Sequence, residues 1–144
     1  MIRKLFVALF TSVWMAGTAC AQAYPSKPVR IVVSFPAGGS TDFLARFLAE
    51  RLQLGLQQSV IVENRPGGNG VIAADFVAKA PPDGHTLFMA VDATMSLNPL
   101  LYSKLPYAPE RDFAPISHVA SQPMFLVASP KAPARTLPGL LAYA

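Results

Sequence analysis

Two glycine-rich segments, each between a β-branched run and a segment with apolar residues at helical spacing, most constrain what this chain can fold into. The first, "FPAGGSTD" at 35–42, follows "PVRIVVS", and the second, "RPGGNG" at 65–70, follows "SVIVEN". The two runs predict buried strands at 28–35 and 59–64, each followed by a helix. Strands that alternate with helices over short connections predict a mostly parallel sheet covered on both faces, so we expect an α/β fold.

The helices are predicted from apolar spacing and from the residues at their ends. In the first helix, Ser40 or Thr41 can act as N-cap, Asp42 suits the helix dipole, and Gly55 is a stop signal. Its expected apolar stripe is Phe43, Leu44, Phe47, Leu48 and Leu52. The second helix covers about 71–80 and ends at "PPDG". Its expected inward residues are Ile72, Phe76 and Val77.

The remaining segments continue the alternation. "HTLFMAV" at 85–91 predicts a third strand, and "DATMSLNPLLY" predicts a turn and a short helix interrupted by Pro99. The segment 117–129 is interpreted as a broken strand because it contains Pro123. "TLPGLLAYA" at the end of the chain predicts the start of a helix, with Thr136 as its cap.

The strand-to-helix turns are predicted to lie together. Right-handed crossovers place them at one edge of a parallel sheet, so 35–41, 64–70 and 91–95 are expected to be neighbours. Ligands of open α/β sheets bind at that edge. A helix N-terminus offers unpaired N–H groups and a partial positive charge, and glycine lets a ligand approach them. Two such turns side by side predict an anion site built from backbone groups.

The composition of these turns points to a carboxylate held without cationic side chains. Neither glycine-rich turn contains a lysine, and Arg65 is their only arginine. The groups expected to hold the carboxylate are the backbone N–H and hydroxyl groups of Gly38, Gly39, Ser40 and Thr41. The small residues Ala93 and Thr94 leave room on the third turn. The alternative is that the glycines only permit tight turns.

Other site chemistries find no support. The chain lacks the pattern G-x-x-x-x-G-K-[ST], and the glycines of 67–70 lack the G-x-G-x-x-G spacing of dinucleotide sites. Ser40, Asp92 and His85 do not form a credible triad, because no G-x-S-x-G elbow exists and His85 opens a strand at the opposite end. His118 stands alone, so we expect both histidines to be structural and expect no metal or cofactor.

The N-terminus has the pattern of a secretory signal peptide. Arg3 and Lys4 precede an apolar stretch at 5–17 and then small residues. The stretch is shorter than the ~20 apolar residues that span a bilayer. We therefore expect residues 1–23 to be a signal peptide and the protein to be exported to the periplasm.

Two A-x-A frames, at 19–21 and 21–23, fit signal cleavage, and we prefer the second, which leaves Tyr24 at the N-terminus. Lipidation at Cys20 is the alternative; cleavage before Tyr24 would remove this sole cysteine and exclude a disulfide framework. The formal charge of +4 would fall to +2 without the two basic residues of the leader. Because the remaining lysines and arginines are scattered singly, we expect no nucleic-acid partner.

The combination of "FPAGGSTD", "ENRPGGNG", "PPDGHTL" and "NPLLY" at these spacings resembles one family closely. It is the extracytoplasmic solute receptors of the tripartite tricarboxylate transporters, known as Bug or TctC-like receptors. The likeness runs from Tyr24 to the last residue. It implies a type II periplasmic binding-protein fold, in which two α/β domains close over a small carboxylate such as a dicarboxylate, an amino acid or an aromatic acid.

The resemblance also implies which residues bind the ligand. In the first turn these are Phe35, Ala37, Gly38, Gly39, Ser40, Thr41 and Asp42. The second and third turns add Gly67, Gly68, Asn69, Asp92, Ala93 and Thr94. Asp42 is expected to support the turn rather than touch an anion. Asp92 replaces the small neutral residue expected there, so it either repels an anion or pairs with an amine on the ligand.

Receptors of this family are much longer than this chain, so the second domain is expected to be largely missing. Residues 24–118 are interpreted as an incomplete first domain, and 119–144 as a strand crossing between domains and the start of a truncated second domain. The function implied is capture of a solute by a monomer and delivery to membrane subunits. The alternatives are a nonfunctional receptor remnant and an exported α/β hydrolase-type enzyme.

Overall fold

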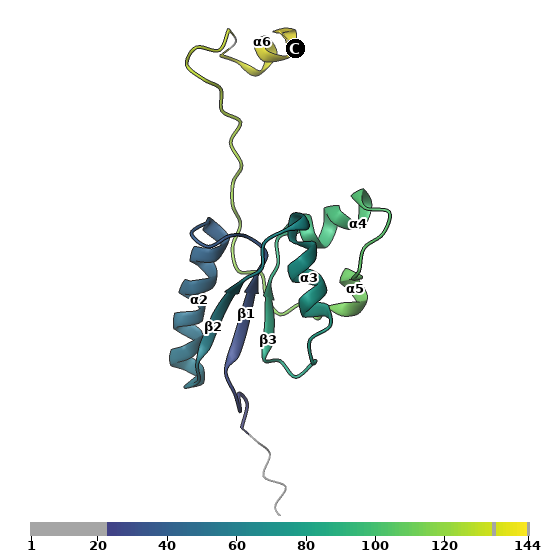
Figure 1. Cartoon of the computed structure of the whole chain (residues 1–144). Coiled ribbons are helices and arrows are strands. Elements are labelled where there is room, and N and C mark those ends of the chain that lie inside the picture. Colours follow the sequence, from purple (N-terminus) through teal and green to yellow (C-terminus); the bar gives the residue numbers. More distant parts are fainter. Residues whose placement is uncertain (1–22, 134, 144) are drawn as a thin grey trace, which may run out of the picture. The chain divides into compact units, whose positions relative to one another are not determined.

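The computed structural model describes residues 23–133 and 135–143, and its centre is a three-stranded parallel sheet (Figure 1). The strands are β1 (Val29–Val33), β2 (Val60–Asn64) and β3 (Thr86–Met89). Their order is β2-β1-β3. Val33 of β1 is level with both Asn64 and Met89. All three strands therefore end at the same edge, which confirms the predicted α/β fold with a parallel sheet.

Helix α2 (Ser40–Leu56) connects β1 to β2 and packs on one face of the sheet. Its closest residues to the sheet are the small Ala45 and Ala49, which join Ile31 and Val33 in the core. Leu48 and Leu52 of the predicted stripe also pack on this core, and Leu44 is half-buried.

The prediction for two aromatic residues of α2 is wrong: Phe43 is 69% exposed and Phe47 is 49% exposed. The helix approaches the sheet through alanines, and this contact turns the two phenylalanines outward. The helix also continues past Gly55 and ends at Leu56, and its C-cap, Gln57, has a left-handed conformation (φ 53°).

Helix α3 (Val71–Ala78) connects β2 to β3 and contacts β1 and β3. The strand order β2-β1-β3 reverses the direction of the crossover, so α3 covers the face opposite to α2 (Figure 1). Ala73 and Ala74 are its fully buried residues. The predicted inward position of Ile72 is wrong, since 54% of this residue is exposed.

The chain after β3 forms short helical segments. The π-helical turn η2 (Ala93–Leu97) continues directly into α4 (Asn98–Leu101), and α5 (Pro109–Asp112) follows. Pro99 lies in the first turn of α4, where its missing N–H is tolerated. The prediction that Pro99 interrupts the helix is therefore wrong. Phe113 after α5 packs against Phe88 of β3, with 5.8 Å between ring centroids.

Residues 115–144 form a second compact unit, separate from residues 1–114. Helix α6 (Leu137–Tyr143) begins as predicted at Thr136, whose Oγ1 accepts a hydrogen bond from Gly139 N at 3.2 Å. The segment 117–129, predicted as a broken strand, has no strand structure. The described residues provide it with no paired neighbouring strand, and a strand needs one. The proposed domain boundaries stay a prediction.

The predicted signal peptide lies outside the described residues, apart from residue 23. Within the described part of the chain, none of the helices has the length and apolar character needed to cross a bilayer.

Candidate functional site

The first turn, between β1 and α2, leaves the start of a helix open. Gly38 has a φ of +89°, a conformation that favours glycine. Gly39 is the N-cap, and no side chain within residues 23–133 and 135–143 caps the helix. Ser40 and Thr41, predicted as caps, are instead the first two helical residues, because the extended conformation falls on Gly39. Phe43 N donates to Gly39 O at 2.9 Å, so the N–H groups of residues 40–42 have no partner within the helix.

The carboxylate of Asp42 supports this turn. Its Oδ2 accepts hydrogen bonds from Gly38 N at 2.9 Å and from Arg46 Nε at 3.0 Å, and its Oδ1 accepts from Asn64 Nδ2 at 2.9 Å. These donors, with Arg46 the strongest contributor, lower the pKa of Asp42 from 3.8 to about 2. Because the carboxylate is 5% exposed and fully engaged, it orders the turn and does not present a free charge.

Asn64, the last residue of β2, joins the first turn to the second. Its Nδ2 also donates to Phe35 O at 3.0 Å, and its Oδ1 accepts from Arg46 at 3.2 Å. The next residue, Arg65, donates its N–H to Val33 O at 2.8 Å. The sequence analysis missed Asn64, although an asparagine directly between a strand and a glycine-rich turn is a signal for such a role.

The second turn has an unusual backbone. Gly67, Gly68, Asn69 and Gly70 all have positive φ values, of 129°, 56°, 53° and 87° respectively. A Cβ atom added at Gly67 would lie 2.6 Å from Ile72 Cδ1, and one at Gly70 would lie 2.5 Å from Thr94 Oγ1. The glycines therefore serve both conformation and close packing.

The third turn places its predicted residues in different environments. Thr94 is fully buried, and its Oγ1, like the Oγ of buried Ser34, has no hydrogen-bond partner among the residues that the structure describes. Ala93 is half-buried. Asp92 is exposed, its Oδ1 accepts from Ser96 Oγ at 3.0 Å, and it forms no ion pair within the described residues.

Two buried residues that the sequence analysis missed connect the second and third turns. Asn98 is fully buried: its Oδ1 accepts from Asn69 Nδ2 at 2.8 Å, and its Nδ2 donates to Asn69 O at 3.0 Å. Asn98 Nδ2 also lies 3.3 Å from Tyr107 Oη, which donates to Thr94 O at 2.7 Å. The side-chain amide nitrogen of the exposed Asn69 therefore donates to a buried partner, Asn98.

The three turns lie at one edge of the sheet, as the parallel strands require (Figure 1). The first turn follows the central strand β1, so it lies between the other two. Of the predicted residues, Gly38, Gly39, Ser40 and Ala37 are exposed, while Phe35 and Thr41 are half-buried. The arrangement offers backbone N–H groups without helical partners at the start of α2, next to the second glycine-rich turn, and such groups suit an anion.

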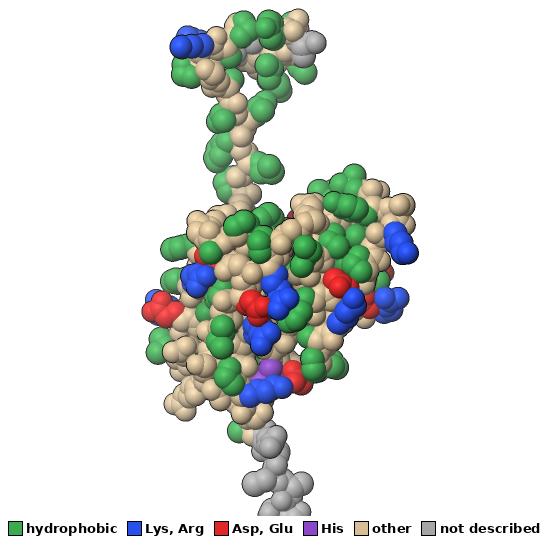
Figure 2. All heavy atoms as spheres, in the orientation of Figure 1, with side chains coloured by type: hydrophobic (Ala, Val, Ile, Leu, Met, Phe, Trp, Pro, Cys, Tyr) green, Lys and Arg blue, Asp and Glu red, His purple; other side chains and the backbone are tan. Residues whose placement is uncertain are grey.

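Charged side chains are mixed on the face shown in Figure 2, where basic and acidic groups lie close together. Glu63 pairs with both Arg30 and Arg65, at 3.2 and 2.6 Å, and Lys79 pairs with Asp75. Arg65 also lies 3.6 Å above the ring centroid of Phe76. The only arginine of the two glycine-rich turns is therefore engaged with Glu63 and Phe76. Within the described residues, no group of three or more His, Cys, Asp or Glu side chains could hold a metal ion.

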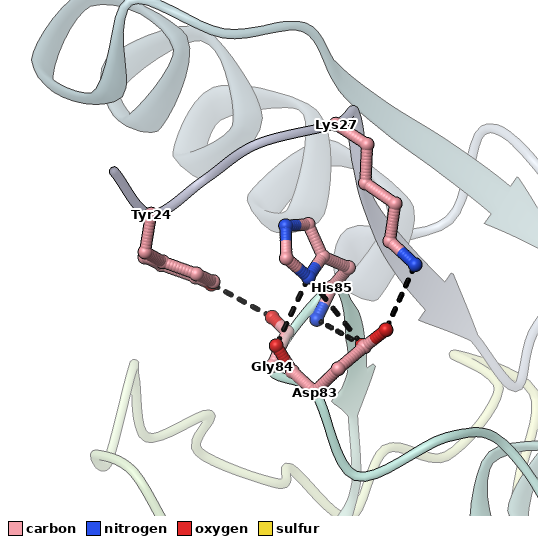
Figure 3. Close-up of polar contacts among 5 residues, drawn as sticks. All are labelled: Tyr24, Lys27, Asp83, Gly84 and His85. Carbon is pink, nitrogen blue, oxygen red and sulfur yellow. Dashed lines mark hydrogen bonds and ion pairs between the residues drawn. The ribbon is translucent and has the colours of Figure 1, made fainter. Parts of the chain in front are cut away.

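A separate polar cluster closes the other end of the sheet (Figure 3). Tyr24 Oη donates to Gly84 O at 2.7 Å, and Lys27 Nζ lies 2.8 Å from Asp83 Oδ2. The hydrogen bond from Lys27, together with one from His85 N, lowers the pKa of Asp83 to about 2. His85, just before β3, is thus far along the strand from the glycine turns and takes part in structural contacts.

Comparisons with known proteins point to one family. The family described as "Tripartite tricarboxylate transporter family receptor" matches residues 44–144. The chain is 40% identical over 129 residues to protein BugT of Bordetella pertussis, covering 89% of this chain and 40% of BugT. It spans about two fifths of the length of the curated relatives it matches.

Solved structures are also similar. Rpa4515 of R. palustris, solved with adipate, has 38% sequence identity and a TM-score of 0.76, covering 84% of this chain and 40% of that one. MatC of Rhodopseudomonas palustris, solved with bound malate, has 37% identity and a TM-score of 0.61, covering 67% of this chain and 33% of that one.

The solved periplasmic binding protein BugD is also similar, with 44% sequence identity and a TM-score of 0.60, covering 65% of this chain and 31% of that one. The fold is that of a domain of a periplasmic binding protein. The chain belongs to the receptor family of the tripartite tricarboxylate transporters, as its sequence predicts.

Proposed function

We propose that this protein is a periplasmic substrate-binding protein that captures a small carboxylated solute for a tripartite tricarboxylate transporter. The observation that carries the proposal is the uncapped start of α2 at the glycine turn, where the N–H groups of residues 40–42 have no partner within the helix. Adipate and malate in the two related structures support a carboxylate as the class of ligand.

In this proposal the backbone does most of the binding. The N–H groups of Ser40 and Thr41 receive the carboxylate. The exposed glycines 38 and 39 leave room for it, since the Gly38 N–H already donates to Asp42. Phe35, Ala37 and the turn 67–69 lie beside it. Asp42 supports the turn. Ala93 and Asp92 border the site, whereas Thr94 is buried next to Gly70 and supports the second turn.

The charge of Asp92 bears on the choice of ligand. Its carboxylate is exposed and unpaired by any basic group in the part of the chain described. An unpaired carboxylate next to an anion site repels a second negative charge and attracts a cation. A ligand with an ammonium group near its carboxylate is therefore favoured over a plain dicarboxylate, and aspartate against malate is the comparison that separates the two cases.

The proposed mechanism is capture, closure and delivery, with no bond made or broken. A signal peptide at 1–23 exports the chain, which acts as a monomer. Residues 24–118 supply the first wall of the site, and 119–144 lead toward a second domain. Closure of that domain over the solute then presents it to the membrane subunits.

A pair of substitutions at Ser40 tests the backbone contact. Ser40→Pro removes the N–H at the first helical position, where proline is tolerated, and the extended Gly39 before it suits a following proline. Ser40→Ala is the matched control, because it removes the hydroxyl and keeps the N–H.

Calorimetric titration of the full-length protein with adipate, malate and aspartate measures the effect. Ser40→Pro is expected to weaken binding by roughly 10- to 100-fold relative to Ser40→Ala, the value of one charge-assisted hydrogen bond. Equal affinities for the two variants, with both folded, would show that the Ser40 N–H does not touch the ligand.

A further inference from the structure

Two buried side chains form hydrogen bonds with the second and third turns. Asn98 is fully buried and Tyr107 is 4% exposed. Asn98 forms hydrogen bonds with the side chain and the backbone oxygen of Asn69 in the second turn. Tyr107 donates a hydrogen bond to the backbone oxygen of Thr94 in the third turn. The two residues also contact each other at 3.3 Å.

We propose that Asn98 and Tyr107 are positioning residues of the carboxylate site, which hold the second and third turns together as one unit. This inference rests on the proposed function of the site. Neither side chain needs to touch the solute, because each acts through the backbone that it holds.

The backbone of the second turn shows why such a tie is needed. Asn69 is the one non-glycine residue among four consecutive residues with positive φ. Asparagine tolerates this conformation better than most residues but still prefers others. Asn98 binds both the amide nitrogen and the backbone oxygen of Asn69, so it favours this conformation over the alternatives.

The third turn is held by a different group. The hydroxyl of Tyr107 donates to Thr94 O at 2.7 Å, inside the first turn of η2. Thr94 in turn lies against Gly70, whose added Cβ would come within 2.5 Å of Thr94 Oγ1. A displacement of Thr94 therefore changes the surface on which the second turn rests.

Tyr107→Phe is the variant that tests this tie, since it removes one oxygen and keeps the ring that packs on Phe113. Ile31→Val is the control, because it weakens the core on the α2 face and touches neither turn. Amide hydrogen exchange of the ligand-free, full-length protein is followed at Gly70, Thr94 and Arg30. Their N–H groups donate to Gly67 O, Val91 O and His85 O respectively.

Tyr107→Phe is expected to speed exchange at Gly70 and Thr94 by roughly tenfold relative to Arg30, because a buried carbonyl loses its donor. Ile31→Val is expected to change all three by a similar factor. The same exchange profile in both variants would overturn the proposal.

Calorimetric titration with adipate, malate and aspartate separates positioning from simple support, and the affinities are compared for the acid that the wild-type protein binds most tightly. Tyr107→Phe is expected to weaken binding by roughly fivefold or more, while Ile31→Val leaves it within about twofold. Faster exchange at the turns without loss of affinity would mean that the tie is only structural, and would overturn the positioning role. The exchange measurement needs no ligand. It therefore tests whether the hydrogen bond from Tyr107 to Thr94 O stabilises the turns, even if the wild-type protein binds no carboxylate and the proposed function fails.

Discussion

At the scale of single residues, the candidate site depends on positions where a side chain would be in the way. The four residues 67–70 have positive φ, and a Cβ atom at Gly70 would meet the buried side chains of Thr94 and Ser34. Glycine is needed there for two independent reasons, conformation and packing. The glycine content of the turns is thus a physical requirement of the structure, whatever the ligand.

Gly70→Ala is expected to destabilise the protein by about 2 kcal/mol, because alanine at φ +87° is strained and its Cβ would meet Thr94 Oγ1 at 2.5 Å. Gly55→Ala is the matched control: it lies in helix α2 with open space around it, and should stabilise by about 0.5 kcal/mol. Urea unfolding measures both. A Gly70→Ala variant as stable as the wild type would contradict the described turn.

Asp42 gives the protein a defined dependence on pH. Its folded pKa, about 2, is below its ordinary value of 3.8, so the ionised form stabilises the folded state. That contribution is complete above about pH 4 and is lost as the pH falls from about 4 to about 2. Asp42→Asn should therefore lower the melting temperature at pH 7 and flatten its decrease between pH 4 and 2.

Glu50→Gln is the control for Asp42→Asn, because it removes a charge from the exposed side of the same helix. It should leave the pH profile close to that of the wild type. If the two variants had the same profile, the hydrogen bonds to Asp42 would not explain its low pKa.

At the scale of elements, sequence patterns predicted the strands and the helix order but not which faces of the helices are buried. Short β-branched runs are typical of strands that are buried on both faces of a sheet. The predicted bounds of β1, β2 and β3 are therefore close to the observed ones. For α2, periodicity favoured five large apolar residues, whereas the core contains Ala45 and Ala49, with only Leu48 and Leu52 of the predicted stripe packed against it. A helix that packs closely on a sheet needs small residues at the contact. The distance between helix and sheet cannot be predicted from the spacing of apolar residues in the sequence.

The corrected orientation of α2 makes a prediction of its own. Leu48→Ala should cost about 2 kcal/mol of unfolding free energy, because Leu48 packs on the core. Phe43→Ala should cost less than about 0.5 kcal/mol, since this larger side chain is mostly exposed. Chemical denaturation of both variants decides between the two orientations; a greater loss for Phe43→Ala would restore the stripe expected from the sequence.

The candidate site was predictable to a similar degree. Glycine runs between strands and helices identified the turns and the sheet edge. The groups that fix them, Asn64, Asn98 and Tyr107, were missed because their partners are backbone atoms or side chains up to 29 residues away. Such pairings depend on the folded backbone and leave no periodic signal in the sequence.

At the scale of the whole molecule, the chain joins a binding-protein domain to a short second unit. Residues 1–114 contain the sheet and all three turns, and 115–144 contain α6. Family membership and the shared fold are shown, and the chain spans about two fifths of its curated relatives. The proposed function therefore depends on whether the sheet edge with the two glycine-rich turns binds a carboxylate.

The amide proton shifts of residues 39–42 during titration of the full-length, ¹⁵N-labelled protein with adipate, malate or aspartate test this claim most directly. We predict that the Ser40 and Thr41 amide protons move downfield and saturate with at least one of the three acids, as expected for N–H groups that donate to an anion. Two results would contradict this prediction. In one, the shifts of Ser40 and Thr41 stay unchanged while residues elsewhere in the protein show saturable shifts. In the other, none of the three acids changes any shift.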